Sequence, residues 1–111
     1  MRRLNAIDQV FKALADSSRR KLLDELFMNN GQTLSELCQL LEMSRQAVTR
    51  HLVILEEANL VVVEWHGRNK LHYLNPVPIN EISKRWINKY DQKRLEALSK
   101  LKDELEEGNK E

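Results

Sequence analysis

The chain has one cysteine, two prolines and three glycines among its 111 residues. A single thiol, Cys38, cannot form an intrachain disulfide or a cysteine-rich metal site, and it fits the reducing conditions of the cytoplasm. Aromatic residues make up 5% of the chain. Because turn-forming and aromatic residues are both scarce, an all-β sandwich is not expected. These shortages favour a small, helix-rich cytoplasmic protein.

Strong charge of one sign and long apolar runs are also missing. The formal net charge is +1, so any role with nucleic acid must come from the distribution of charge and not from its total. No apolar run approaches the ~20 residues needed to cross a bilayer, and the N-terminus has no continuous apolar stretch typical of a signal peptide. The length predicts a single domain over residues 1–111.

Two helices are predicted at the start of the chain. Apolar residues recur at helical spacing, which predicts a helix over about 5–15; they are Leu4, Ile7, Phe11 and Leu14. Asp16 and the following serines supply capping side chains for a second helix over about 18–28. Its inward residues are predicted to be Leu22, Leu23, Leu26 and Phe27.

The most informative stretch is 33–57, which predicts a helix-turn-helix. Thr33 and Glu36 have the spacing of a capping box at the start of its first helix, and Ser44 is the expected N-cap of the second. The second helix has a buried stripe of Val48, Leu52 and Leu55. Its opposite face is polar, as a helix needs if it packs on a core and also reaches base edges in a DNA major groove.

From Leu60 the apolar period changes from about 3.6 to 2. Strands over 60–65 and 70–74 flank a turn that contains Gly67, so residues 60–74 predict a β-hairpin. Residues 75–78 contain both prolines and are expected to interrupt regular structure. A long helix follows over about 79–107.

The predicted fold class is therefore mainly α with a small β-hairpin, in the order α-α-α-α-β-β-α. This is a winged helix-turn-helix with a long C-terminal dimerisation helix. We expect DNA contacts from Ser44, Arg45, Gln46, Thr49, Arg50, His51, Arg68, Asn69 and Lys70. The polar helix face could instead be an ordinary solvated one, His51 could close the helix packing, and the basic hairpin tip could only keep a strand edge soluble.

The C-terminal helix carries more apolar surface than a small globule needs. A two-fold homodimer built on this helix and the first one would bury this apolar surface. It would also place two recognition helices about 34 Å apart on a palindromic site. The predicted interface residues are Leu4, Ile7, Phe11, Ile82, Trp86, Tyr90, Leu98 and Leu101. Trp86 and Tyr90 could alternatively line a site for a small apolar ligand. A protein-interaction module that uses the long helix is the alternative function.

The sequence resembles the ArsR-type bacterial transcriptional repressors over about residues 7–107. Three segments carry the resemblance: Phe11–Leu23, Ser44–Leu60 and Gly67–Tyr73. It implies a homodimer that binds double-stranded operator DNA and is released by a signal. Thr33 and Ser35 stand where thiolate-sensing members have a Cys-x-Cys pair, and the last helix has no histidine. The family's metal sites are therefore not expected, and an unknown inducer or a sequestering protein is the possible signal.

Enzyme activity is not expected. The sequence has no Gly-rich phosphate loop and no recognisable Ser/His/Asp or Cys/His constellation. Its three histidines lie in or beside the DNA-reading elements. Neither a cofactor nor a metal ion is predicted.

Overall fold

The computed structural model describes residues 5–108, except for the side chains of Ile87, Asn88 and Tyr90. It divides into two compact units, Met1–Ile79 and Asn80–Glu111. Two of the predicted interface side chains, those of Leu4 and Tyr90, lie outside the described residues. Within residues 5–108, every helix is too short or too polar to cross a bilayer.

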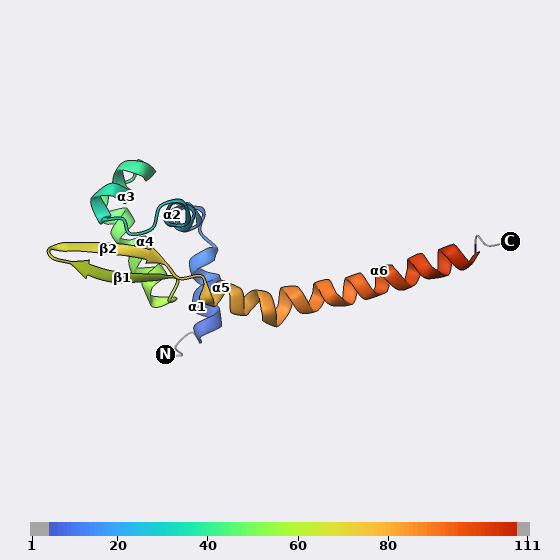
Figure 1. Cartoon of the computed structure of the whole chain (residues 1–111). Coiled ribbons are helices and arrows are strands. Elements are labelled where there is room, and N and C mark those ends of the chain that lie inside the picture. Colours follow the sequence, from blue (N-terminus) through green and yellow to red (C-terminus); the bar gives the residue numbers. More distant parts are fainter. Residues whose placement is uncertain (1–4, 109–111) are drawn as a thin grey trace. The chain divides into compact units, whose positions relative to one another are not determined.

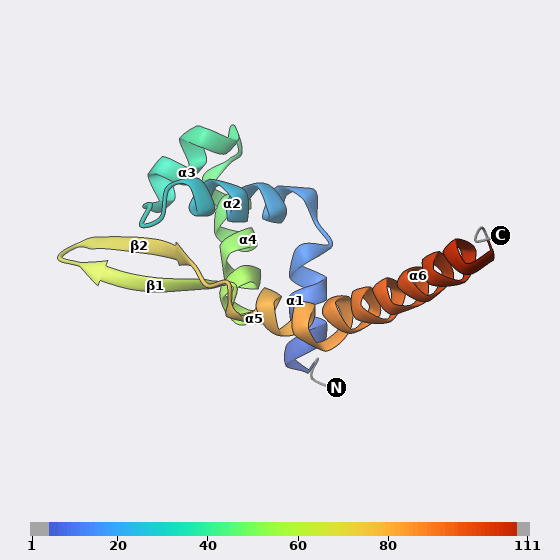
Figure 2. The ribbon, with the colours of Figure 1, turned by 45° about the vertical axis from the view of Figure 1, so that its right-hand side comes forward.

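The first unit is a winged helix-turn-helix, as predicted. Its helices are α1 (Ala6–Leu14), α2 (Ser17–Met28), α3 (Leu34–Leu41) and α4 (Arg45–Glu57). Strands β1 (Val61–His66) and β2 (Asn69–Leu74) follow and pair antiparallel. Both ribbon views show this hairpin projecting from the base of α4, alongside the helix-turn-helix (Figures 1 and 2).

Polar side chains cap the helices where the sequence predicts them. The Thr33 side chain accepts a bond from the Glu36 backbone N–H, and the Glu36 carboxylate accepts one from the Thr33 backbone N–H. This is the reciprocal capping box. Ser44 Oγ accepts from the Ala47 N–H at 3.1 Å and starts α4. Between the two helices Glu42 adopts a left-handed conformation with φ of 51°, which turns the chain.

The core lies between α1, α2, α3, α4 and the base of the hairpin. Its fully buried large apolar side chains are Leu22, Leu26, Leu37, Val48, Leu55 and Leu60. The prediction for Phe27 was wrong, because this side chain is 73% exposed. Leu22, Leu23 and Leu26 define the buried face of α2, and each residue advances about 100° around a helix, so Phe27 turns away from it.

The hairpin is anchored to the helices by a buried polar bridge. Gln32, in the loop between α2 and α3, forms an isolated β-bridge with His72 of β2. The His72 N–H donates to the Gln32 carbonyl at 2.9 Å, and His72 Nδ1 lies 2.9 Å from the same oxygen. Gln32 Nε2 donates to the Asn29 carbonyl at 2.6 Å at the end of α2. The bridge therefore connects the hairpin to the end of one helix and the start of another.

The C-terminal helix departs from the prediction in two ways. It starts earlier, with α5 (Val77–Ile82), and a π-helical turn, η1 (Ser83–Ile87), separates α5 from α6 (Asn88–Gly108). Pro78 does not prevent the early start, because the N–H that proline lacks has no helical partner in a first turn. The π turn accommodates an extra residue, a local change that apolar spacing does not reveal.

Candidate nucleic-acid interface

The exposed face of α4 carries the polar side chains expected to read DNA. Arg45, Gln46, Thr49 and Arg50 are all exposed, opposite the buried Val48 and Leu52. Arg45 Nη1 donates to Ser35 Oγ of α3 at 3.3 Å, and Thr49 Oγ1 donates to the Arg45 carbonyl at 2.7 Å. These bonds orient two of the four side chains, while Gln46 and Arg50 extend from the same surface.

His51 faces the interior of the first unit and not this surface. Its Nδ1 lies 3.3 Å from Arg19 Nη1 and 3.8 Å from Asp16 Oδ2. Arg19 Nε also donates to the Ala13 carbonyl at 2.8 Å, at the end of α1. This geometry corresponds to the packing alternative for His51, because the ring links α4 to the corner between α1 and α2.

The hairpin tip presents Arg68 and Asn69 to solvent. A two-residue loop connects the strands, and its first residue, Gly67, has φ of 62°, which glycine adopts without steric cost. Lys70 is exposed as well, but its Nζ lies 3.8 Å from Glu56 Oε1 of α4. Lys70 therefore connects the hairpin to the recognition helix.

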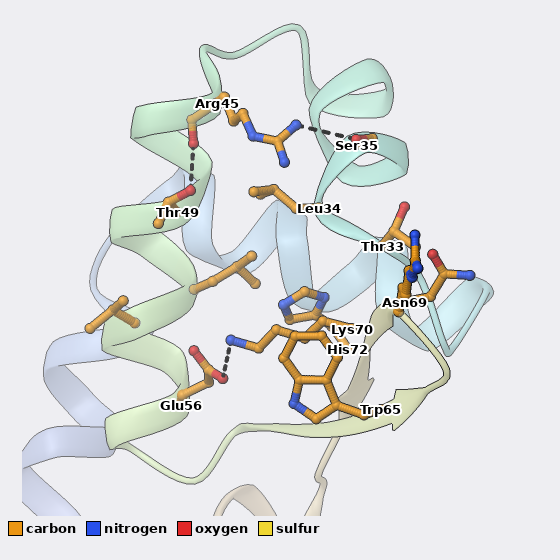
Figure 3. Close-up of a pocket in the computed structure, with 13 residues that line it drawn as sticks. Thr33, Leu34, Ser35, Arg45, Thr49, Glu56, Trp65, Asn69, Lys70 and His72 are labelled. Carbon is orange, nitrogen blue, oxygen red and sulfur yellow. Dashed lines mark hydrogen bonds and ion pairs between the residues drawn. The ribbon is translucent and has the colours of Figure 1, made fainter.

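A groove of about 340 Å³ lies between α3, α4 and the hairpin (Figure 3). We refer to it as the wing groove. Its floor and walls include expected DNA-binding residues, namely Arg45, Thr49, Arg68, Asn69 and Lys70. It also includes residues that sequence reasoning did not select, among them Ser35, Val53, Glu56 and Trp65. The sequence could have identified Val53, because it follows Thr49 by four residues and therefore lies on the same face of the helix. It could also have identified Trp65, because side chains alternate along a strand and Trp65 therefore shares a face with the inward Val61 and Val63.

Most of the described residues predicted for the dimer interface are accessible. Phe11 is 47% exposed, and Leu98 and Leu101 of α6 are 53 and 52% exposed. Ile7 and Trp86 are half-buried, and the Arg85 guanidinium lies 5.5 Å from the centre of the Trp86 ring. Ile82 is buried within the single chain, which leaves little of its surface for a partner.

Possible metal ligands are dispersed. Among the described residues, no three His, Cys, Asp or Glu side chains are grouped so that they could hold a metal ion. Cys38 is a free, partly buried thiol on α3. Thr33 takes part in the capping box, and Ser35 accepts the bond from Arg45.

The fold and this surface define a winged helix-turn-helix transcriptional regulator that binds DNA. A family model described as a helix-turn-helix domain matches residues 14–64. The HTH-type transcriptional regulator YuzN of Bacillus subtilis is 41% identical over 86 residues, which cover 72% of this chain and 94% of YuzN. The arsenical resistance operon repressor of the same organism is 32% identical over 69% of this chain and 73% of its own length.

An ArsR-like transcriptional regulator from Rhodococcus sp. RHA1 has a similar solved structure. It superimposes with a TM-score of 0.69 at 30% identity, covering 86% of this chain and 92% of that one. The chain belongs to the ArsR family of helix-turn-helix transcriptional regulators.

Proposed function

We propose that the protein represses transcription by binding a palindromic operator as a homodimer. The observation that carries the proposal is the continuous exposed face of Arg45, Gln46, Thr49 and Arg50 on α4, beside a basic hairpin tip in the same unit. In such an arrangement α4 lies in the major groove, and the hairpin contacts the backbone of the adjacent segment.

Each side chain on this surface has a chemical role in the proposal. Gln46 can make bidentate bonds to adenine, and Arg45 or Arg50 can pair with guanine or a phosphate. Ser44 can contact a phosphate while it caps α4, and Arg68 and Asn69 reach the sugar–phosphate backbone. His51 acts by holding α4 in place and not by contacting DNA.

The homodimer is proposed to form through the exposed leucines of α6 together with Phe11 of α1. Leu95, Leu98, Leu101 and Leu105 are between 52 and 62% exposed. A helix with an apolar stripe of this kind is stabilised when a second helix covers it. Two-fold symmetry then pairs each recognition helix with one half-site. We expect the protein to act in the cytoplasm and to respond to a signal other than the metals bound by the family's cysteine or histidine sites.

The test is DNA binding by the purified protein to the region upstream of its own coding sequence, measured over a series of salt concentrations. Binding should weaken steeply with salt, because phosphate contacts release counterions. Arg50→Ala should weaken binding and Lys21→Ala should not, since Lys21 is an exposed cation on α2 outside this surface. Affinity for a protein partner that changes little with salt, with no DNA binding at low salt, would instead support the interaction-module alternative.

Base reading by Gln46 has its own test. Gln46→Ala should relax the sequence preference at one base pair of each half-site, at a cost of roughly 1–3 kcal/mol for the preferred base. The measurement is competition between operators that vary at one position at a time. An unchanged preference at every position would contradict this role, whatever the overall affinity.

A further inference from the structure

Trp65 lies on the face of the hairpin that is turned toward α4. Side chains alternate along β1, so Val61, Val63 and Trp65 share one face, and the strand register places Lys70 opposite Trp65 and His72 opposite Val63. Val61 and His72 are buried at the base of this face, whereas Trp65 near the tip is 64% exposed. In Figure 3 the indole lies beside Lys70, across the wing groove from Glu56.

A single exposed apolar side chain needs no special explanation. The position of Trp65 is what matters, because its ring forms a wall of the groove whose other lining residues include Arg45 and Lys70. A tryptophan here does not complete the core, because Val61 is the last buried residue along β1. The indole therefore presents a large apolar surface inside the region expected to meet DNA.

The lining of the groove matches the chemistry of a nucleic-acid backbone. Within the described residues, the lining has three basic side chains, Arg45, Arg68 and Lys70, and one carboxylate, Glu56. The lining also includes apolar groups from Leu34, Val53 and Trp65. A DNA strand has both kinds of group as well, since its charged phosphates are joined by the less polar deoxyriboses.

We propose that Trp65 is a DNA-contacting residue, and that the wing groove receives one sugar–phosphate strand with the indole packed against a deoxyribose. This inference rests on the proposed DNA-binding function and extends it to a residue and a groove. The cations contribute the salt-dependent part of the affinity, because they displace counterions. The indole contributes a part that does not depend on salt, since covering apolar surface releases no ions. The contact is to the backbone, so it is independent of base sequence.

The experiment uses the full-length protein and a mixed-sequence DNA duplex of about 30 base pairs, long enough for two half-sites one helical turn apart. Trp65→Ala should lower the affinity for DNA about tenfold at every salt concentration, which is the scale expected when an aromatic contact is lost. The slope of log K against log [salt] should stay unchanged. Trp65→Phe should retain most of the affinity. Arg68→Ala, which removes another cation from the lining, should instead reduce the slope by about one. Phe27→Ala, which removes an exposed aromatic side chain from α2, is the matched control and should change nothing.

A second readout reports the contact directly. The chain has two tryptophans, and Trp65→Phe retains Trp86. The emission of the parent protein should change when the mixed-sequence duplex is added, and this change should be lost in Trp65→Phe. Circular dichroism and thermal melting should show that each variant folds as the parent does.

The outcomes separate the two proposals. Equal affinity of Trp65→Ala and the parent at all salt concentrations overturns the role of Trp65, while the DNA-binding function stands. A shallower salt slope in Trp65→Ala also overturns it, because the indole would then act by positioning the basic side chains. Failure of the parent protein to bind any duplex at low salt overturns the proposed function and this contact together.

Discussion

Glu56 places a carboxylate in a groove whose other charged side chains include Arg45 and Lys70. The carboxylate lies 3.8 Å from Lys70 Nζ and is partly buried. It therefore holds the hairpin to α4, and it also neutralises a cation that could otherwise pair with a phosphate. Close to DNA the same carboxylate repels the backbone, since like charges are unfavourable wherever screening is incomplete.

We predict that Glu56→Gln strengthens DNA binding by several-fold and steepens the salt dependence by about one unit of slope, because Lys70 becomes free to pair with a phosphate. The amide is close in size to the carboxylate, so the groove should keep its shape. Glu57→Gln is the control, as Glu57 is exposed and is not part of the lining. A fall in affinity in Glu56→Gln would show that the ion pair mainly positions the hairpin for binding, and an unchanged affinity would contradict the predicted repulsion.

At the scale of elements, the hairpin depends on its attachment to the helices. An isolated two-stranded hairpin is marginally stable in water. Here the Gln32 carbonyl accepts from the His72 N–H, and the Gly31 and Gln32 N–H groups donate to the His72 carbonyl. Gly31 has φ of 80°, and a side chain there would come within 3.2 Å of the Tyr73 hydroxyl oxygen. The loop before α3 is therefore shaped to fit against β2.

Gln32→Ala should lower the free energy of unfolding by about 1 kcal/mol, because the partly buried Asn29 and Glu25 carbonyls lose the donor that the Gln32 amide supplies. Urea denaturation measures this change. Amide exchange at Leu71 and His72 should also accelerate if the hairpin loosens. Gln39→Ala is the control, since Gln39 is exposed on α3. Stability equal to that of the parent would mean that the backbone bonds alone hold the hairpin.

At the scale of the whole molecule, the first third of α6 and the remainder of this helix carry opposite net charges. Over residues 88–94 the charged residues are Lys89, Asp91, Lys93 and Arg94. Over residues 95–107 they are Glu96, Lys100, Lys102, Asp103, Glu104, Glu106 and Glu107. The first segment is therefore net positive and the second net negative. Two copies of α6 that cross antiparallel near residues 99 and 100 would bring Leu95 close to the partner's Leu105, and the basic segment close to the acidic one.

An antiparallel dimer makes a prediction about reversing these charges. Lys93→Glu with Arg94→Glu should raise the dimer dissociation constant about tenfold, since exposed attractive pairs become repulsive. Glu106→Lys with Glu107→Lys should do the same. All four changes in one chain should restore the parent value, because opposite charges face each other again. Sedimentation equilibrium measures the dissociation constants of the parent and of the three variants, with helicity checked by circular dichroism. If the fourfold variant has a higher dimer dissociation constant than either double variant, the antiparallel arrangement is contradicted.

Several features of the interface could be predicted from neighbouring residues. The capping box at Thr33, the Ser44 cap and the outward face around Gln46 all depend on spacing within one or two helical turns. Phe27 was misplaced because apolar character alone does not show where a helix meets the core. The π turn at Ser83–Ile87 was missed because the apolar pattern on either side of it still fits a continuous helix.

The order of helices and strands, their caps and the exposed polar face of α4 follow from short-range interactions that the local sequence specifies. The partners of individual side chains depend on packing between distant segments. Arg19 and His51 are 32 residues apart, and Gln32 and His72 are 40 residues apart. The pairing of Lys70 with Glu56 and the place of Trp65 in the wing groove arise in the same way. These contacts appear only when distant segments pack against one another. Sequence periodicity sets the face on which a side chain lies, and tertiary packing sets its neighbour.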